Sequence, residues 1–202
     1  MNFLAHAYLS FNQPELLLGN MISDFVKGKK QYDYPEKIHQ GILLHRSIDA
    51  FTDQHESTQR IKQLFKPFYG LYAAAFADVV YDYFLANDSQ EFSQEQHLSD
   101  FAEETYTQLA NQSVFFPENF SAAFHYMRQQ NWLLNYRHTW GIEKSFGGVV
   151  RRAKYLSDAS PAFSVFEKNI EQLQRCYDEF FPAVKEHALG KATLFSTSPT
   201  PP

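Results

Sequence analysis

Cysteine, positive charge and long apolar runs are all scarce in this sequence. Its one cysteine, Cys176, excludes an internal disulfide framework and a metal site built from several thiolates. A formal net charge of −5 argues against broad binding to nucleic acid, because that function needs a basic surface. Apolar runs stop well short of the roughly 20 residues that cross a bilayer, and the first residues do not resemble a signal peptide. We therefore expect a cytoplasmic protein whose partners include neither nucleic acid nor a membrane. The oligomeric state is not defined by the sequence.

Glycine is also sparse, with 8 residues, and the glycine-rich motifs that bind phosphate groups are missing from the sequence. There is no P-loop, no dinucleotide-binding glycine motif and no nucleophile elbow. Ser47 lies between His45 and Asp49, but its spacing does not place it on their helix face. A serine triad is therefore not predicted.

Aromatic residues are abundant, and they predict a packed interior because each buries a large apolar area. They make up 17% of the chain, with 20 Phe and 12 Tyr. Few stretches alternate in the manner of a β-strand. Pro14 and Pro35 mark helix starts, and Gly28 marks a helix end. We expect helices over residues 15–27, 35–55, 57–66, 70–86, 93–111, 118–131, 142–157 and 162–188.

These helices predict an all-α fold, a single-domain helical bundle over residues 1–192. The sequence shows neither an internal repeat nor a clear linker. Residues 193–202 include a stretch rich in Pro, Ser and Thr. A segment of that composition is expected to be a disordered tail.

The pair His45 and Asp49 is the most informative feature of the chain. Residues four apart share one face of a helix. At about 100° per residue, the pair falls in one stripe with Ile38, Ile42 and Thr52. An imidazole and a carboxylate on a core-facing stripe are costly unless they are paired, hydrogen-bonded or bound to a metal ion. The stripe is therefore a candidate functional site.

Three further segments place polar residues on apolar faces, at His6, at Asp24 and at the pair Asp78 and Asp82. Carboxylates and imidazoles without thiols suit Mn²⁺, Mg²⁺, Fe²⁺ or Zn²⁺, and helical bundles can build such sites from several inward-facing helices. The alternative is that each residue is a hydrogen-bonded core residue or a helix cap. Spacing alone does not decide whether the four helices converge.

Basic residues form two small clusters outside these stripes. Lys27, Lys29 and Lys30 follow the segment that carries Asp24. They indicate a solvated helix end, where cations are favoured by the helix dipole, or a docking site for an acidic partner. Arg151 and Arg152 follow two glycines. They are surface residues or phosphate contacts, because the guanidinium group matches phosphate geometry.

Four blocks of the sequence together resemble the acyl carrier protein phosphodiesterase family, also called ACP hydrolase. The blocks are Met1-Asn-Phe-Leu-Ala-His6, the segment from Leu18 to Gly28, the segment from Gly41 to Asp53 and the segment from Asp78 to Leu85. The resemblance covers most of the chain, with the specific blocks in its first half.

The resemblance implies a function and a fold. Members of this family hydrolyse the phosphodiester that links 4′-phosphopantetheine to a serine of holo-acyl carrier protein, and they leave the apo protein. The family is similar to HD-type phosphohydrolases, which are all-helical and commonly use Mn²⁺ or a similar ion. No His in this chain is followed by Asp, so the usual His-Asp dipeptide of HD enzymes is missing. His45 and Asp49 replace it in function, or the ligand set is rearranged.

The mechanistic hypothesis that follows assigns a role to each candidate residue. A divalent ion, Mn²⁺ in the first place, polarises the phosphoryl oxygen and activates water. Asp49 and Asp82 are the catalytic carboxylates, and the arginines and lysines contact the substrate. The metal ligands are His6, Asp24, His45, Asp49 and Asp78; the substrate contacts are Arg151, Arg152, Lys27, Lys29 and Lys30. The alternatives are a phosphohydrolase of nucleotides or other small phosphoesters, and a non-enzymatic helical interaction module.

Overall fold

The computed structural model describes residues 1–197, and these residues contain helices and turns but no β-strand. The expected all-α class is confirmed. The first half contains α1 (Phe3–Tyr8), α2 (Pro14–Ile22), η1 (Ser23–Phe25), η2 (Gly28–Asp33), α3 (Glu36–Gln54), α4 (Glu56–Tyr69), η3 (Gly70–Tyr72) and α5 (Ala73–Ala86). The second half contains α6 (Glu95–Ala110), η4 (Ser113–Phe115), α7 (Glu118–Gln129), α8 (Trp132–Asn135), α9 (Thr139–Arg152), α10 (Ser160–Lys168) and α11 (Ile170–Thr197).

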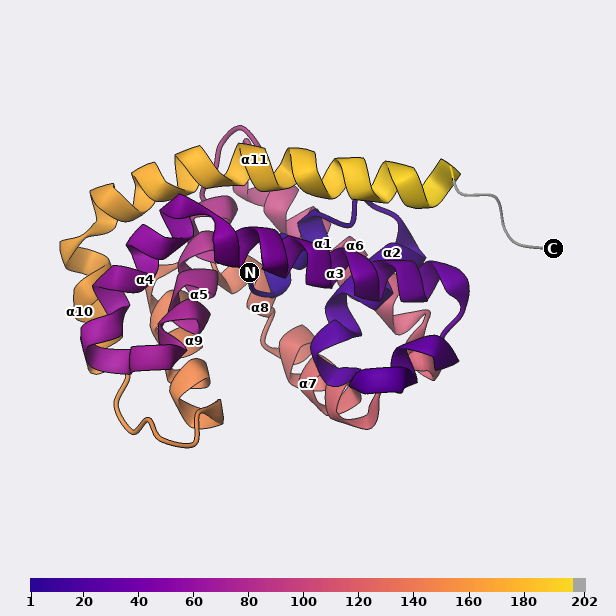
Figure 1. The fold of residues 1–202 in the computed structure, drawn as a ribbon, viewed down its shortest axis with the longest axis horizontal. Helices are drawn as coiled ribbons and strands as arrows, with labels where there is room; N and C mark the ends of the chain where they lie inside the picture. The colour runs from indigo at the N-terminus through magenta and orange to yellow at the C-terminus, as the bar shows by residue number, and fades with distance from the viewer. Residues whose placement is uncertain (198–202) are drawn as a thin grey trace.

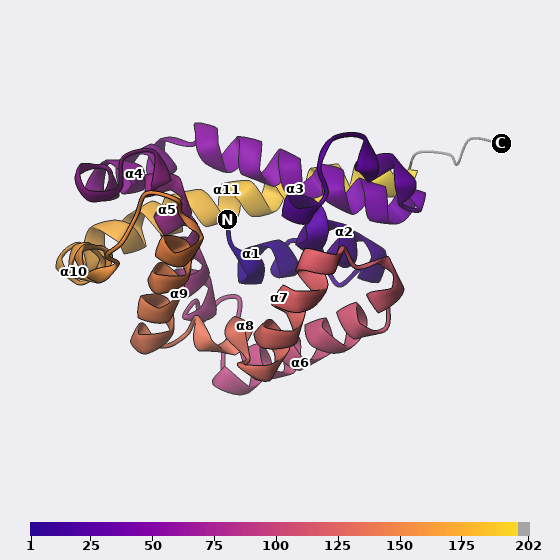
Figure 2. The same cartoon turned by 90° about the horizontal axis from the view of Figure 1, so that it is seen from below.

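The long helices α3 and α11 run along the long axis of the molecule and pack against one another (Figure 1). Helices α4, α5, α9 and α10 gather at one end of this pair, and α2, α6 and α7 gather at the other. The short helix α1 and the N-terminus lie between the two groups (Figure 2). Helix α1 contacts both α2 and α5, so residues of α1 are placed where the two groups of helices meet.

Helices α2 and α3 approach each other closely at two glycines. A Cβ atom at Gly19 would lie 2.0 Å from the carbonyl oxygen of Ile38, and one at Gly41 would lie 2.4 Å from the carbonyl oxygen of Leu16. No side chain larger than hydrogen fits at either position. This contact fixes α2 against α3, and it sets Asn20 on α2 and His45 on α3 at hydrogen-bond distance.

An aromatic core joins α4, α5 and α9. The ring of Phe76 on α5 lies 5.6 Å from that of Phe65 on α4 and 5.5 Å from that of Phe146 on α9, measured between centroids. All three side chains are fully buried. Aromatic pairs at such separations add to the free energy gained from burial. The expectation of a packed aromatic interior is confirmed. This core fixes the position of α5, the helix that carries Asp78 and Asp82.

Several helix ends differ from the expected ranges. The helix expected over 15–27 stops at Ile22, and a 3₁₀ turn carries Asp24. The helix expected over 142–157 spans Thr139–Arg152, because the amide of Ala153 closes its last turn on Val149 and Val150. The helix expected over 162–188 is two helices. Asn169 ends α10 and its side chain donates to the carbonyl of Val165.

The last helix extends into the segment expected to be a tail. Helix α11 continues to Thr197, so residues 193–197 are helical, and residues 198–202 of that segment lie outside the described part of the chain. Within the described residues, no helix combines the length and apolar character needed to cross a bilayer.

Candidate metal centre and active site

The imidazole rings of His6 and His45 stack face to face, and both form hydrogen bonds with Asn20. The ring centroids lie 3.9 Å apart with an angle of 16° between the planes. His6 Nδ1 lies 2.8 Å from the side-chain oxygen of Asn20, and His45 Nδ1 lies 2.8 Å from its backbone oxygen. Both histidines and the asparagine are buried. One residue on α2 therefore orients an imidazole on α1 and another on α3.

The hydrogen bonds of Asn20 define the tautomer of each histidine. The side-chain amide nitrogen of Asn20 donates to the carbonyl oxygen of His6 and to Ser10 Oγ. Its oxygen must then accept from His6 Nδ1, and the backbone oxygen facing His45 can only accept as well. Each imidazole therefore carries its proton on Nδ1. In the neutral form, each ring directs the lone pair of Nε2 away from Asn20.

Both Nε2 atoms face carboxylates. Asp49 has one oxygen 3.2 Å from His6 Nε2 and the other 3.0 Å from His45 Nε2. Asp24 on η1 also reaches His45 Nε2, at 3.2 Å. A lone pair that faces a carboxylate is repelled unless a proton or a cation lies between them. Among the described residues, His6 Nε2 is a buried atom without a hydrogen-bond partner. This geometry fits a metal ion that both nitrogens and Asp49 would contact.

The charges around the cluster act in opposite directions on the two histidines. Burial lowers the pKa of His6 to about 4, and the nearby charge of His45 adds to this effect. Burial also opposes the charged form of His45. The hydrogen bonds and charges of Asp24 and Asp49 outweigh this effect and raise its pKa to about 9. Against its burial, the positive charge of Met1 and the interactions with His6 and His45 hold the pKa of Asp49 well below its usual range. Asp49 is therefore ionised at neutral pH.

Asp78 joins the cluster through a positive charge. The α-amino group of Met1 lies 3.1 Å from Asp78 and 3.3 Å from Asp49. Burial raises the pKa of Asp78, and the amino group partly offsets this increase. The two carboxylates come from α5 and α3, and a cation lies between them. The arrangement thus favours positive charge between Asp49 and Asp78.

Asp82 has a different environment from the other carboxylates. It is fully buried, and its oxygens accept the backbone amides of Leu4 at 2.8 Å and Ala5 at 3.2 Å. Burial raises its pKa to about 7, although these hydrogen bonds work against the increase. These contacts hold the start of α1 against α5. The water-activating role expected for Asp82 from the sequence stays a prediction.

The carboxylate and imidazole cluster can hold a divalent ion. Within the described residues, the ligand atoms of His6, His45 and Asp49 lie within 4.8 Å of one another. Asp24 is at their solvent-facing edge, with 79% of its side chain exposed, against 39% for Asp49. A mixed nitrogen and oxygen donor set without thiolate suits Mn²⁺, Fe²⁺, Zn²⁺ or Mg²⁺. Histidines that bind metals in proteins are commonly oriented by a hydrogen bond from the other ring nitrogen, and the bonds from Nδ1 of His6 and His45 to Asn20 are of that kind.

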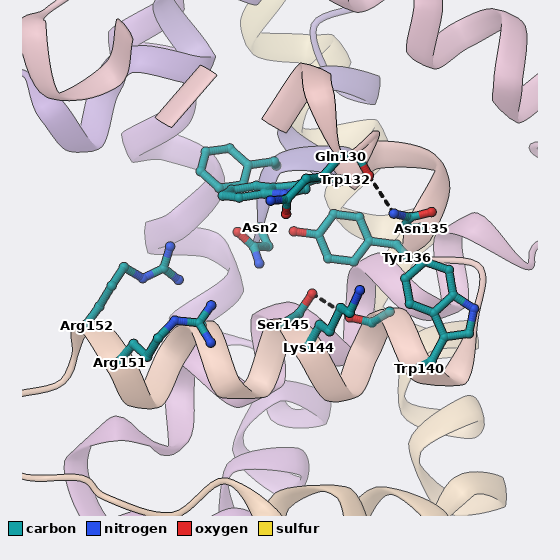
Figure 3. Close-up of a pocket in the computed structure, with 13 residues that line it drawn as sticks. Asn2, Gln130, Trp132, Asn135, Tyr136, Trp140, Lys144, Ser145, Arg151 and Arg152 are labelled. Carbon is teal, nitrogen blue, oxygen red and sulfur yellow. Dashed lines mark hydrogen bonds between the residues drawn. The ribbon is translucent and has the colours of Figure 1, made fainter. Parts of the chain in front are cut away.

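The predicted basic residues do not join this cluster. Lys27, Lys29 and Lys30 are exposed and follow Asp24 in the chain. Arg151 and Arg152 are exposed on α9 and line a cavity of about 590 Å³ whose wall includes Asn2. Figure 3 shows both guanidinium groups on the side of α9 that faces Asn2.

Comparison with known proteins adds an independent observation. The family model described as acyl carrier protein phosphodiesterase matches residues 1–184. This chain belongs to the acyl carrier protein phosphodiesterase family.

Curated relatives in this family match nearly the whole chain. The protein named acyl carrier protein phosphodiesterase from Photorhabdus laumondii is 30% identical, over 95% of this chain and 96% of its own length. Two further proteins of the same name also match over 95% of this chain. The one from Yersinia pestis is 29% identical over 99% of its own length, and the one from Salmonella paratyphi A is 28% identical over 100% of its own length. No solved structure matches significantly, so the likeness to HD-type enzymes stays a prediction.

Two groups in the site of this family member were not predicted from its sequence. One is Asn20, and its signal was present, because an amide inside the apolar run Leu16–Ile22 needs buried partners. The other is the amino group of Met1. No sequence pattern marks it, since its position depends on how α1 packs against α2 and α5.

Proposed function

We propose that this protein hydrolyses the phosphodiester linking 4′-phosphopantetheine to a serine of holo-acyl carrier protein, leaving the apo protein. Membership of the acyl carrier protein phosphodiesterase family supports the reaction. The observation that carries a metal-dependent mechanism is the pair of imidazoles whose Nε2 atoms face Asp49. Without a cation, the neutral ring of His6 would place a lone pair against this carboxylate, and His45 faces it only by carrying a proton on Nε2.

His6, His45 and Asp49 would hold the ion, with Asp24 and Asp78 at its edges. We propose Mn²⁺, while the donor set also suits Mg²⁺, Fe²⁺ or Zn²⁺. When bound, such an ion polarises a phosphoryl oxygen and makes a water molecule more acidic. Asp24 is the more exposed carboxylate, and it would accept a hydrogen bond from the attacking water. Asp82 would keep α1, and with it His6, in place.

The reaction forms a bond from the water oxygen to phosphorus and breaks the bond from phosphorus to the serine oxygen. The serine oxygen leaves with the electron pair and takes up a proton, so the products are apo-carrier protein and 4′-phosphopantetheine. Arg151 and Arg152 would balance the negative charge of the phosphate, because one guanidinium group can donate two parallel hydrogen bonds to phosphate oxygens.

The direct test is a mass-spectrometric assay of holo-carrier protein with added Mn²⁺. We expect the wild-type protein to remove the phosphopantetheine mass and Asp49→Asn to lose about 10²- to 10³-fold in rate, the range for removing one group that stabilises the transition state. Asp53→Asn is the matched control, because Asp53 is an exposed carboxylate one turn further along α3, beside Lys62. Equal rates for the two variants would contradict the proposed role of Asp49.

Lys27, Lys29 and Lys30 would dock the acidic carrier protein on this net negative chain. Reversing their charges should raise KM for holo-carrier protein far more than KM for a small phosphodiester. Lys66→Glu with Lys168→Glu provides a control of the same kind, since both side chains are exposed on other helices. If both substrates respond equally, the docking role is wrong. Small esters hydrolysed as fast as carrier protein would instead favour a general phosphohydrolase.

A further inference from the structure

The cavity beside α9 has the size of a small-molecule site. Its volume is about 590 Å³, and small-molecule pockets typically measure roughly 300–1,000 Å³. The walls come from α8, α9 and the start of α1. Figure 3 shows Tyr136, Trp132 and Asn2 on one side and α9 on the other.

The chemistry of the cavity changes along α9. Arg151 and Arg152 lie at the C-terminal end of the helix, and Trp140 lies near its start. At 1.5 Å per residue, Trp140 and Arg152 are roughly 18 Å apart. Lys144 lies between them, with its ammonium group 4.8 Å from the centre of the Trp140 ring. The cavity therefore has two guanidinium groups at one end and, at the other, an indole ring with an ammonium group against it.

Two glycines lie beside the cationic end. Gly147 and Gly148 lie one turn before Arg151, and the Arg151 guanidinium lies 3.4 Å from where a Cβ of Gly147 would be. The arginine side chain therefore folds back along the helix. Its guanidinium group faces the cavity in Figure 3.

The cavity also borders the metal-binding cluster. Asn2 lines the cavity and directly follows Met1, whose amino group contacts Asp49 and Asp78. Burial raises the pKa of Tyr136 well above its usual value, and the charge of Asp82 contributes to the increase. A ligand whose phosphate lies beside Asn2 would thus have its phosphorus near the cluster and its remaining length in the cavity.

We propose that this cavity binds the 4′-phosphopantetheine arm itself, an inference that rests on the proposed function. The arm has a phosphate at one end, a dimethyl-substituted carbon and hydroxyl next, two amides, and a terminal thiol. The arginines would face the phosphate end. Trp132 and Trp140 would pack on the apolar carbons, and the side-chain amide of Asn135 would pair with an amide of the arm. The order of these groups along the arm matches the order of the lining residues along α9, and this match makes the prosthetic group the occupant.

The test uses the two tryptophans of the chain, Trp132 and Trp140, both of which line the cavity. Titrating the Mn²⁺-loaded protein with 4′-phosphopantetheine should give a saturable change in tryptophan fluorescence, while inorganic phosphate alone should give little. Trp140→Ala should weaken binding by about tenfold, as lost burial of one aromatic contact predicts. It should raise KM for holo-carrier protein by a similar factor and change kcat less.

A second variant shows whether weaker binding comes from the cavity itself and not from misfolding. Gly148→Leu should favour the helix and extend into the cavity, because a Cβ there meets only the end of Arg151, at 3.6 Å. It should weaken binding of the arm to the same extent. Phe68→Ala is the control, since Phe68 is 56% exposed on α4, outside the cavity. Mn²⁺ affinity, measured on each variant, reports whether the metal-binding cluster is intact.

The outcomes distinguish this inference from the proposed function. If the wild-type protein does not release 4′-phosphopantetheine from holo-carrier protein, the proposed function itself fails. If it does, but the cavity variants keep the wild-type Kd and KM, the arm binds elsewhere. A fluorescence change of equal size with apo-carrier protein, which has no arm, would show that the cavity contacts the carrier protein surface and would overturn the inference.

Discussion

Asn20 connects the two imidazoles of the cluster through one side chain and one carbonyl group. Its side-chain oxygen accepts from His6 and its backbone oxygen accepts from His45. A substitution at residue 20 removes the first bond and leaves the second, because any residue supplies a carbonyl. The two histidines should therefore respond differently to the same change.

We expect Asn20→Ala to weaken Mn²⁺ binding by about 10- to 100-fold, the usual effect of losing an outer contact to a metal-binding histidine. The unfolding free energy should also fall by about 1–3 kcal/mol, because buried polar groups of His6 and Ser10 lose their partner. Calorimetric titration with Mn²⁺ and denaturant unfolding measure the two effects. Asn169→Ala, which removes a side-chain to backbone hydrogen bond on α10, should leave Mn²⁺ affinity unchanged. Similar losses of affinity in both variants would contradict the role of Asn20.

We expect His45 to make metal binding depend on pH. Before an ion binds, its pKa is about 9, so at pH 7 it carries a proton that binding must displace. His6, with a pKa of about 4, is already neutral and contributes nothing in this range. Apparent Mn²⁺ affinity should therefore rise by up to about tenfold per pH unit between pH 7 and 9, then level off.

Calorimetry in buffers of different ionisation enthalpy measures the protons released. About one proton per ion at pH 7 is the expected result. An affinity that does not change between pH 7 and 9 would mean that His45 is already neutral.

At the scale of the helices, the sequence predicted which segments are helical better than it predicted where they end. The stripe through Ile38, Ile42 and His45 is buried as expected, because the spacing of apolar residues in a long amphipathic helix predicts which face is buried. Asp24 was expected inside an α-helix, and it lies on a 3₁₀ turn instead. That turn depends on contacts with α3, such as the bond from Ser23 to Ile42. A single segment of sequence does not contain this information.

The glycine contact between α2 and α3 gives a prediction for a whole element. We expect Gly41→Ala to lower the unfolding free energy by about 1–3 kcal/mol, as overpacking does, because the new Cβ would meet the backbone of α2. Separating the helices should also weaken Mn²⁺ binding, since Asn20 and His45 sit beside the contact. Gly190→Ala on α11 is the matched control, because nothing lies within 4 Å of its Cβ position. It should be neutral or stabilise by up to about 1 kcal/mol. Chemical denaturation of both variants checks the result.

At the scale of the whole molecule, the candidate site exists because α1 lies between the two groups of helices. Helix α1 supplies His6, α3 supplies His45 and Asp49, and α5 holds α1 through Asp82. The sequence marked each of these residues as a polar residue on an apolar face. It did not show that the faces meet, because no periodicity within one helix encodes its distance from another. Residues such as Lys27 and Arg151 gave weaker signals, since exposed charges are common on any helix.

We infer that His6, His45 and Asp49 bind one divalent ion. The most direct measurement is an anomalous difference map from crystals of this protein grown with Mn²⁺. We expect a peak within coordination distance of both Nε2 atoms and of the Asp49 carboxylate, and loss of that peak in Asp49→Asn crystals. A protein that removes 4′-phosphopantetheine in the presence of Mn²⁺ but shows no peak at these three residues would contradict this inference.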